Sequence, residues 1–413
     1  MYDHEYFVVK DYEHTNIVQT LKRSTFSVLF TTVFLDFLGF ALILPYIFFY
    51  AEGFGASPLV YGLLLSSYSI AQFVFTPVWG SLSDRFGRRK IILLCLIGSG
   101  ISFVIFGMAT NLTVVFISRI AAGAMAATFP VAMAYIADIT TPETRFKHMA
   151  RIGAAFGLGM IVGPAIGGTL SSLYGYTVPS LVAAMIAFSN FAIAYFKLPE
   201  SLLEKQRNTK KETFLSTFKS VADKSDIKLI LAAFFIAMVA FFVMDGTATP
   251  WTERVFGFGP FQAGLLFFYI GSVIVIVQGL LIPKLSKSYS PQLLLVVGII
   301  AIASGLAMLG SITTEILSAL IISSMMIPLG MGFTIASVNM LVSLRSSVDQ
   351  QGSAFGVTYS VSGIAQIAGP AFGASMFGYG ISVGIDGLPF IVSAALTIPA
   401  IILTMNLKGR FVR

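Results

Sequence analysis

The sequence predicts an all-α membrane protein with twelve transmembrane helices in two six-helix bundles. The chain of 413 residues is 56% hydrophobic and only 11% charged, whereas a soluble domain is typically about a quarter charged. Its apolar residues gather in stretches that are each long enough to cross about 30 Å of hydrocarbon as a helix. The second half of the chain also repeats the pattern of the first. Together these observations predict that the protein lies in a bilayer.

The predicted spans follow one another through short connections, with one longer polar stretch between the sixth and the seventh. They cover residues 26–50, 58–80, 91–110, 112–136, 150–172, 177–197, 228–250, 261–283, 291–310, 314–344, 352–378 and 384–407. We therefore expect an N-terminal segment at 1–25, a first bundle at 26–198, a linker at 199–227, a second bundle at 228–407 and a tail at 408–413.

The positions of Lys and Arg orient the predicted spans. If the N-terminus is cytoplasmic, every Lys and Arg falls in a cytoplasmic segment except Arg119, inside a span, and Arg254, outside. Because basic residues favour the cytoplasmic side, we expect a multi-pass protein of the cell membrane with both termini cytoplasmic. The net charge of +7 then reflects topology, and we expect no nucleic-acid partner. The single cysteine, Cys95, predicts neither a disulfide nor a metal site.

The stretch Pro77–Lys90, PVWGSLSDRFGRRK, is the densest charge cluster between two spans, and we call it the latch segment. Its two glycines predict a tight turn across which charges can pair. Its spacing, G-x-L-x-D-R-x-G-R-R, resembles the cytoplasmic loop signature of the major facilitator superfamily. The resemblance implies that Asp84 meets the other half of the protein when the inside is closed. The alternative is a positive loop that only fixes orientation. The signature positions are Gly80, Asp84, Arg85, Gly87, Arg88 and Arg89.

Similarity between the halves indicates an internal duplication. The segment from Ser57 resembles the segment from Gly259, and GMIVGPAIGG from Gly159 resembles QIAGPAFGA in the second half. Duplication in parallel orientation predicts two bundles around an axis normal to the membrane. The second copy of the latch segment keeps Lys284 and Lys287 but lacks the glycines and the Asp, so we expect the halves to differ in gating.

Asp36 is an acidic residue inside the first predicted span. An ionised carboxylate that faces lipid is costly, so we expect this side chain to face the bundle interior and to exchange a proton. The run D-x-x-G-x-x-x-x-x-P, from Asp36 through Gly39 to Pro45, resembles the first-helix motif of drug:proton antiporters. The alternative is that Asp36 only pairs with a neighbouring helix and never titrates.

Arg119 is a cation well inside the fourth predicted span. Because arginine stays charged, it needs a carboxylate, carbonyl groups or water there. With Gly123 it resembles the R-x-x-x-G element of the family's fourth helix, which the resemblance links to proton coupling. We hypothesise that Arg119 stabilises ionised Asp36 in one conformation and leaves it in the other.

The fifth predicted span contains the run G-x-x-x-G-P-x-x-G-G. Small residues at this spacing let helices pack closely, and the proline bends the helix. The run resembles the antiporter signature of the superfamily, which implies export, although Ala150 stands where that signature has a further glycine. The alternative is a tightly packed helix without directional meaning. The residues of the run are Gly159, Gly163, Pro164, Gly167 and Gly168.

Other polar residues within the spans are candidates for a substrate cavity. Asp245 could accept a second proton or a cation, or could only mark a helix end, and the amides could line the cavity or only link helices. We expect Asp138, at the end of the fourth span, to cap that helix or to pair with Arg145, Arg151 or the latch segment. The cavity candidates are Gln72, Asp245, Gln278, Asn339 and Gln366.

The sequence contains no Walker loop and no HExxH, CxxC or GxSxG motif, which predicts a protein that is not an enzyme and uses no cofactor or metal. We interpret it as a secondary active transporter that exports a drug-like or other small organic molecule by alternating access, in exchange for protons. The expected partners are that substrate, the proton and the lipid bilayer, and we expect a monomer. The alternatives are a proton-coupled symporter for a nutrient or metabolite, and a non-transporting membrane receptor on the same fold.

Overall fold

The computed structural model describes residues 25–201, 225–346 and 351–405, and every regular element in these ranges is a helix. Eleven helical stretches in them are long and apolar enough to cross a membrane. The span predicted at 352–378 is the 33-residue helix α15, Gln351–Val383, which is rich in glycine and serine and is not one of the eleven. The all-α membrane fold is confirmed. The expected segment 1–25, most of the linker 199–227 and the tail 408–413 lie outside the described residues.

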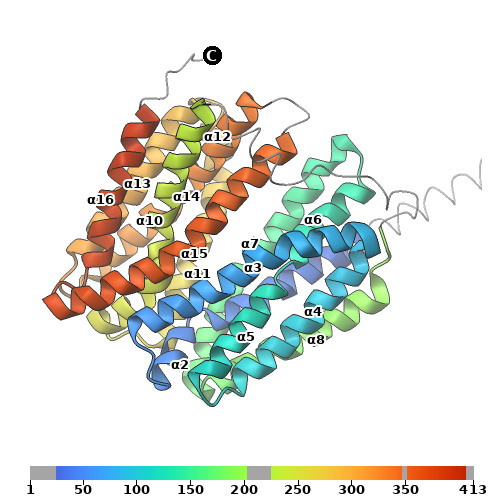
Figure 1. The fold of residues 1–413 in the computed structure, drawn as a ribbon, viewed down its shortest axis with the longest axis horizontal. Helices are drawn as coiled ribbons and strands as arrows, with labels where there is room; N and C mark the ends of the chain where they lie inside the picture. Colours follow the sequence, from blue (N-terminus) through green and yellow to red (C-terminus); the bar gives the residue numbers. More distant parts are fainter. Residues whose placement is uncertain (1–24, 202–224, 347–350, 406–413) are drawn as a thin grey trace, which may run out of the picture.

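The helices follow the predicted spans closely (Figure 1). The first half contains Thr25–Ile43, α2 Ile47–Gly53, α3 Pro58–Phe86, α4 Arg88–Gly107, α5 Leu112–Ala124, α6 Thr128–Ile139, α7 Pro142–Tyr174 and α8 Thr177–Lys197. The second half contains α10 Ser225–Phe256, α11 Pro260–Ile276, the π-helical segment η2 Val277–Leu281, α12 Ile282–Leu285, α13 Pro291–Ser311, α14 Leu317–Arg345, α15 and α16 Leu388–Met405.

Proline interrupts three of the predicted spans. The first helix ends in a turn at residues 44–46, around Pro45, before α2 begins. The fourth span divides into α5 and α6 at residues 125–127, just before Pro130. In the eighth span the π-helical segment η2 precedes Pro283. Proline lacks an N–H and its ring clashes with the carbonyl four residues earlier, which favours an interruption at these three positions, whereas α3 and α7 continue through Pro77 and Pro164.

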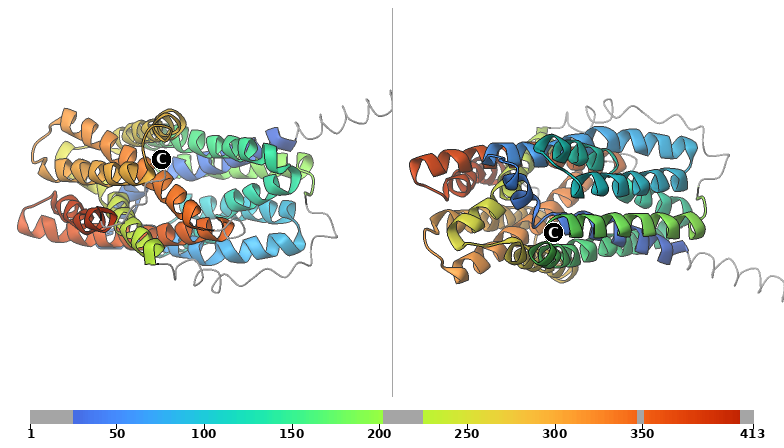
Figure 2. Two further views of the ribbon diagram at one scale, coloured as in Figure 1. Left: turned by 90° about the horizontal axis from the view of Figure 1, so that it is seen from above. Right: turned by 90° about the horizontal axis from the view of Figure 1, so that it is seen from below.

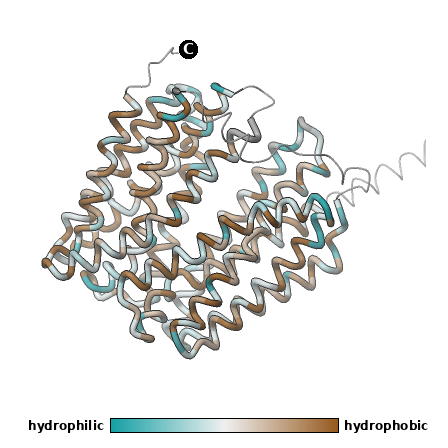
Figure 3. Tube along the Cα trace, viewed as in Figure 1, coloured by the Kyte–Doolittle hydropathy of each residue, from teal (hydrophilic) through white to brown (hydrophobic). Residues whose placement is uncertain are grey.

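Each half has its own hydrophobic core. Two clusters of buried side chains lie in the first half, and one large cluster, which runs from Ile227 to Ala400, lies in the second. Figures 1 and 2 show the helices up to α8 in one group and those from α10 to α16 in another. Figure 3 shows hydrophobic residues along most of each helix. The two predicted bundles are therefore present.

The halves touch mainly through two helix pairs, α3 with α15 and α7 with α11. Glycine makes both crossings close: a Cβ at Gly62 would lie 2.6 Å from the carbonyl oxygen of Pro370, and one at Gly168 would lie 3.0 Å from the Cα of Gly264. These contacts lie near the beginnings of α3 and α11, far from the latch segment. We call this end of the molecule the closed side and the end with the latch segment the latch side.

Toward the latch side the halves diverge (Figure 1). A Cβ built on Gly80 of α3 or on Gly356 of α15 would have no atom within 4 Å, and the same holds for Gly153 of α7. The side chain of Tyr359, also on α15, is 71% exposed. The helices that meet on the closed side therefore separate toward the latch side.

Candidate functional site

The latch segment is helical except at one residue. Helix α3 continues through Gly80 to Phe86 and α4 begins at Arg88, so only Gly87 interrupts them. The prediction of a turn that spans both glycines is therefore wrong, because a helix tolerates Gly80 in its interior. Gly87 has a φ of 108°, which favours glycine, and a Cβ there would collide with the carboxylate of Glu200.

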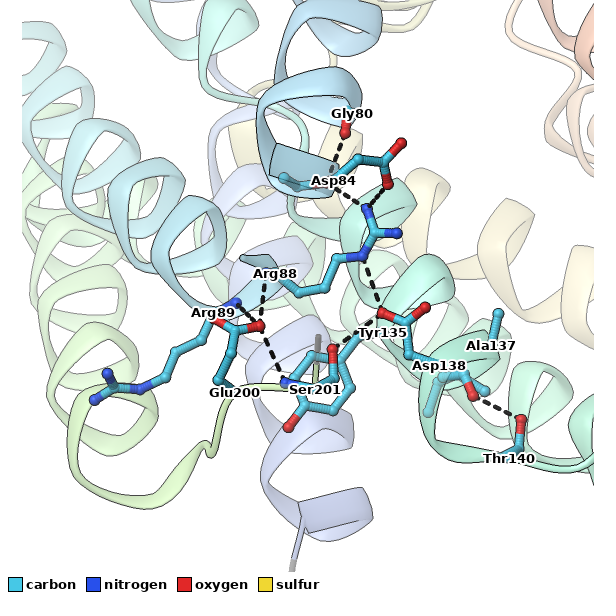
Figure 4. A network of polar contacts seen from close by, with 12 residues as sticks. Gly80, Asp84, Arg88, Arg89, Tyr135, Ala137, Asp138, Thr140, Glu200 and Ser201 are labelled. Atoms are coloured by element: carbon cyan, nitrogen blue, oxygen red, sulfur yellow. Dashed lines mark hydrogen bonds and ion pairs between the residues drawn. The ribbon is translucent and has the colours of Figure 1, made fainter. Parts of the chain in front are cut away.

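Arg88 is the centre of a polar network at this junction (Figure 4). Its guanidinium forms ion pairs with Asp84 and, through Nε at 3.1 Å, with Oδ2 of Asp138. It also donates to the Ser83 hydroxyl at 2.6 Å. The Ser201 hydroxyl donates to the same Oδ2 of Asp138 at 3.1 Å. The network joins α3, α4, α6 and the residues after α8, and it confirms that Asp138 pairs with the latch segment.

Glu200 is a residue of this network that sequence reasoning missed. Its Oε1 accepts from the backbone N–H of Arg88 at 2.8 Å and of Arg89 at 3.5 Å. A carboxylate at a helix N-terminus satisfies free N–H groups and complements the helix dipole. Glu200 therefore caps α4, although it lies 112 residues after Arg88 in the chain. An acidic residue directly after the proline that ends the sixth span was the available signal.

The guanidinium groups of the other two arginines of the latch segment lie outside this network. Arg89 donates to the carbonyl oxygen of Tyr195 and lies 5.4 Å from the centre of the Tyr195 ring. Arg85 is exposed and lies over the ring of Phe86 at 5.3 Å. Their long side chains therefore cover aromatic surface at the latch side, where cation–π contact is favourable.

Asp36 is half-buried in the first helix. Its carboxyl group lies near the Thr128 hydroxyl of α6, although that hydroxyl is not in hydrogen-bond geometry. It also interacts electrostatically with Tyr68 of α3 and Cys95 of α4. The side chain therefore points toward other helices of the first half. In the described part of the chain, no cation lies within ion-pair distance of it.

Arg119 is 3% exposed on α5. Its guanidinium lies 4.4 Å from the centre of the Phe106 ring, and it interacts with Tyr46 and Tyr68. Nε and one terminal nitrogen have no hydrogen-bond partner. Among the described residues no carboxylate pairs with Arg119, so in this conformation the Asp36–Arg119 contact of our hypothesis is not formed.

The glycine run of α7 packs against two helices. Cβ atoms at Gly159 and Gly163 would lie 2.8 and 2.9 Å from backbone atoms of the first helix, and one at Gly167 would overlap the carbonyl oxygen of Leu42. Gly168 and the carbonyl group of Pro164 instead meet Gly264 of α11 in the second half. The run therefore fixes the helix that carries Asp36 and also forms part of the closed side.

The five cavity candidates lie on five different elements, α3, α10, η2, α14 and α15. Asp245 is exposed although Met244 and Gly246 beside it are buried, and its backbone oxygen accepts from the Tyr61 hydroxyl of the first half at 3.4 Å. Gln278 is exposed in η2, a type of segment that is frequent at functional sites. The remaining three, which are Gln72, Asn339 and Gln366, are half-buried, and Oδ1 of Asn339 has no hydrogen-bond partner.

Comparison with known proteins identifies drug-resistance proteins as relatives of this chain. The chain is 29% identical over 407 residues to multidrug resistance protein 2 of Bacillus subtilis, covering 94% of this chain and 96% of that one. It is 30% identical to the class E tetracycline resistance protein of Escherichia coli, covering 82% of this chain and 84% of the relative.

Solved structures show the same fold. The human organic anion transporter MFSD10 matches with a TM-score of 0.68 at 22% identity, over 92% of this chain and 99% of that one. The nucleoside transporter NupG matches with a TM-score of 0.78 at 15% identity, over 94% and 100%. The family model of the Major Facilitator Superfamily matches residues 29–370. Its relatives include multidrug and tetracycline resistance proteins, and the chain belongs to the major facilitator superfamily.

Proposed function

We propose that this protein exports a small, drug-like organic molecule in exchange for protons. The observation that carries the proposal is Asp36, a half-buried acid within a membrane-spanning helix that has no cation beside it in the described part of the chain. An unpaired charge at such a position is costly. Taking up a proton removes that cost, so Asp36 is suited to exchange protons as its surroundings change.

The transport mechanism in this proposal is alternating access. The halves touch on the closed side and diverge on the latch side, which corresponds to one of the two states that such a mechanism needs. With the latch side cytoplasmic and both termini on that side of the cell membrane, residues 1–198 rock against 227–413 to reach the other state. A ligand shifts such an equilibrium only through different affinity for the two states, so proton and substrate compete.

The substrate class comes from the relatives and the cavity candidates. The names of the relatives refer to multidrug and tetracycline resistance, which supports a drug-like organic molecule and export. The exposed Asp245 is available to a substrate or to a second proton between the halves. In this proposal the protein works as a monomer in the bilayer, as a transporter and not as an enzyme.

The test is flux through the purified full chain in proteoliposomes with an imposed pH difference. Tetracycline, the cation tetraphenylphosphonium and a panel of organic acids serve as probes. We expect at least one probe to move against the proton flow and Asp36→Asn to abolish accumulation. Asp386→Asn is the matched control, because Asp386 pairs with Arg254 at 2.8 Å, outside the site. Movement of probe and proton in the same direction would indicate a symporter, and undiminished accumulation by Asp36→Asn would refute the role of Asp36.

A further inference from the structure

The guanidinium group of Arg119 is buried with part of its hydrogen-bonding capacity unused. Its side chain is buried, and Nε and one terminal nitrogen have no acceptor. Buried donors without partners are rare and costly. The face of the Phe106 ring compensates part of the charge, but a ring face does not replace two hydrogen bonds. The guanidinium is therefore ready to donate to an acceptor that moves into reach.

Tyr68 is held beside Arg119 by the packing of α3 on α5. A Cβ at Gly123, one turn after Arg119, would lie 2.2 Å from the carbonyl oxygen of Tyr68, so only glycine allows α3 to approach this closely. On its other side the Tyr68 ring packs against Phe40 of the first helix, with ring centres 5.2 Å apart. The phenol thus stands between α5, which carries Arg119, and the helix that carries Asp36.

Among the described residues Tyr68 is the side chain that interacts with both charges. Asp36 and Arg119 form no ion pair with one another in the described part of the chain, whereas both interact electrostatically with Tyr68. The other titratable group that interacts with Asp36 is Cys95 of α4. From the remaining neighbouring helices, α6 presents the hydroxyl of Thr128, α7 presents Gly159 and α8 presents Asn190, none of which titrates.

The second tyrosine beside Arg119 is already engaged elsewhere. The hydroxyl of Tyr46 is hydrogen-bonded to the Ser180 hydroxyl at 2.9 Å, and the side chain is fully buried. In contrast, Tyr68 is half-buried, and among the described residues no hydrogen bond holds its hydroxyl. Tyr68 is therefore the neighbour that can change partners.

We propose that Tyr68 is a positioning residue that connects Arg119 to Asp36. A phenol hydroxyl can accept one hydrogen bond while it donates another. When Asp36 is ionised, Tyr68 accepts from the guanidinium and donates to the carboxylate, which joins two groups that form no ion pair in the conformation described here. When Asp36 takes a proton from water it no longer needs this donor, and the connection opens. Tyr68 keeps its own proton throughout. The inference rests on the proposed function, because it assumes that Asp36 titrates.

Tyr68→Phe tests the inference, since it keeps the ring and the packing of α3 and removes only the hydroxyl. The purified full chain in liposomes is titrated by infrared spectroscopy, and the carboxyl band of Asp36 is identified by its loss in Asp36→Asn. Without the donor, ionised Asp36 is less stable, so we expect the midpoint of this band to move up by about one pH unit. Tyr269→Phe is the matched control, because it removes a hydroxyl that donates to Ile321 in the second half at 3.2 Å, and it should leave the midpoint unchanged.

Arg119→Gln removes the guanidinium that donates to Tyr68 and so tests the same connection. This second variant keeps the inference testable if Tyr68→Phe does not fold. We expect it to raise the midpoint in the wild-type chain and to add little in the Tyr68→Phe background. A wild-type midpoint in either single variant, or fully additive shifts, would overturn the inference while Asp36 still titrates. If no Asp36 band titrates between about pH 4 and 10, the proposed function fails first.

Discussion

The two halves share a fold but differ at the equivalent junction on the latch side. In the first half, α3 and α4 meet at Gly87, and Arg88 ties this corner to Asp84 and Asp138. In the second half, α11 passes through η2 and α12 into a turn before α13. In the described part of the chain, Lys284 of α12 and Lys287 of that turn pair with no acidic residue.

The difference shows how a duplicated bundle can specialise. The ion pairs of Arg88 connect several helices and make the first junction rigid. Each charge-assisted hydrogen bond restrains the direction of two side chains as well as the distance between them. A π-helical segment followed by proline has weaker and irregular backbone hydrogen bonds, so the second junction can deform more easily. The sequence predicted that the second copy had lost the latch, and the structure shows what replaces it.

The largest effect expected from this comparison is at Arg88. Arg88→Ala leaves Asp84 and Asp138 facing one another without the cation between them, and we expect a loss of about 2 kcal/mol in the free energy of unfolding. Lys284→Ala, the matched change in the second half, should cost less than about 0.5 kcal/mol. Thermal unfolding of the purified variants measures both. Equal losses would show that the first junction is no more rigid than the second.

A smaller difference is expected between the caps of the helices that follow the junctions. The N-terminus of α4 is capped by Glu200, from beyond α8, whereas α13 is capped locally by the Ser290 hydroxyl, which accepts from the N–H of Leu293 at 3.3 Å. Glu200→Ala should cost about 1.5 kcal/mol and Ser290→Ala about 0.5 kcal/mol.

Hydrogen exchange in the first turns of α4 and α13 distinguishes the two kinds of cap. Glu200→Ala should also speed exchange at the end of α8, since that cap connects two helices, whereas Ser290→Ala should affect α13 alone. A larger loss of stability in Ser290→Ala would contradict the contrast between the junctions.

The smallest expected effect on stability is on the closed side, where Glu52 of the first half lies near Glu253 of the second. Burial and the nearby charge of Glu253 raise the pKa of Glu52 above its ordinary value of 4.5. Because this pKa is higher in the folded protein, the stability present below pH 4.5 is partly lost as the pH rises through the raised pKa. Glu52 is exposed, so screening by water and salt keeps the effect small.

Glu52→Gln should remove this loss and flatten the fall in unfolding temperature as the pH rises above about 4.5. The comparison is made between variant and wild type at each pH, so that other acids cancel. A variant curve parallel to that of the wild type would show that Glu52 and Glu253 do not repel across the halves.

The sequence alone determined the spans, the duplication and the family resemblance, because hydropathy and motif spacing are properties of neighbouring residues along the chain. It also predicted which residues carry charge within the membrane, including Asp36 and Arg119. It did not predict that α3 runs through Gly80, since a glycine in a helix and a glycine in a turn look alike in a short segment.

Only the tertiary structure decided which groups meet. The cap of α4 by Glu200 and the position of Tyr68 between Asp36 and Arg119 depend on how α8, α3 and α5 rotate and approach. Those rotations come from the packing of glycines such as Gly123 against neighbouring backbones, over long separations in the chain. No periodicity along one helix contains that information, because the same pattern fits several rotations and only close packing of the whole bundle selects one.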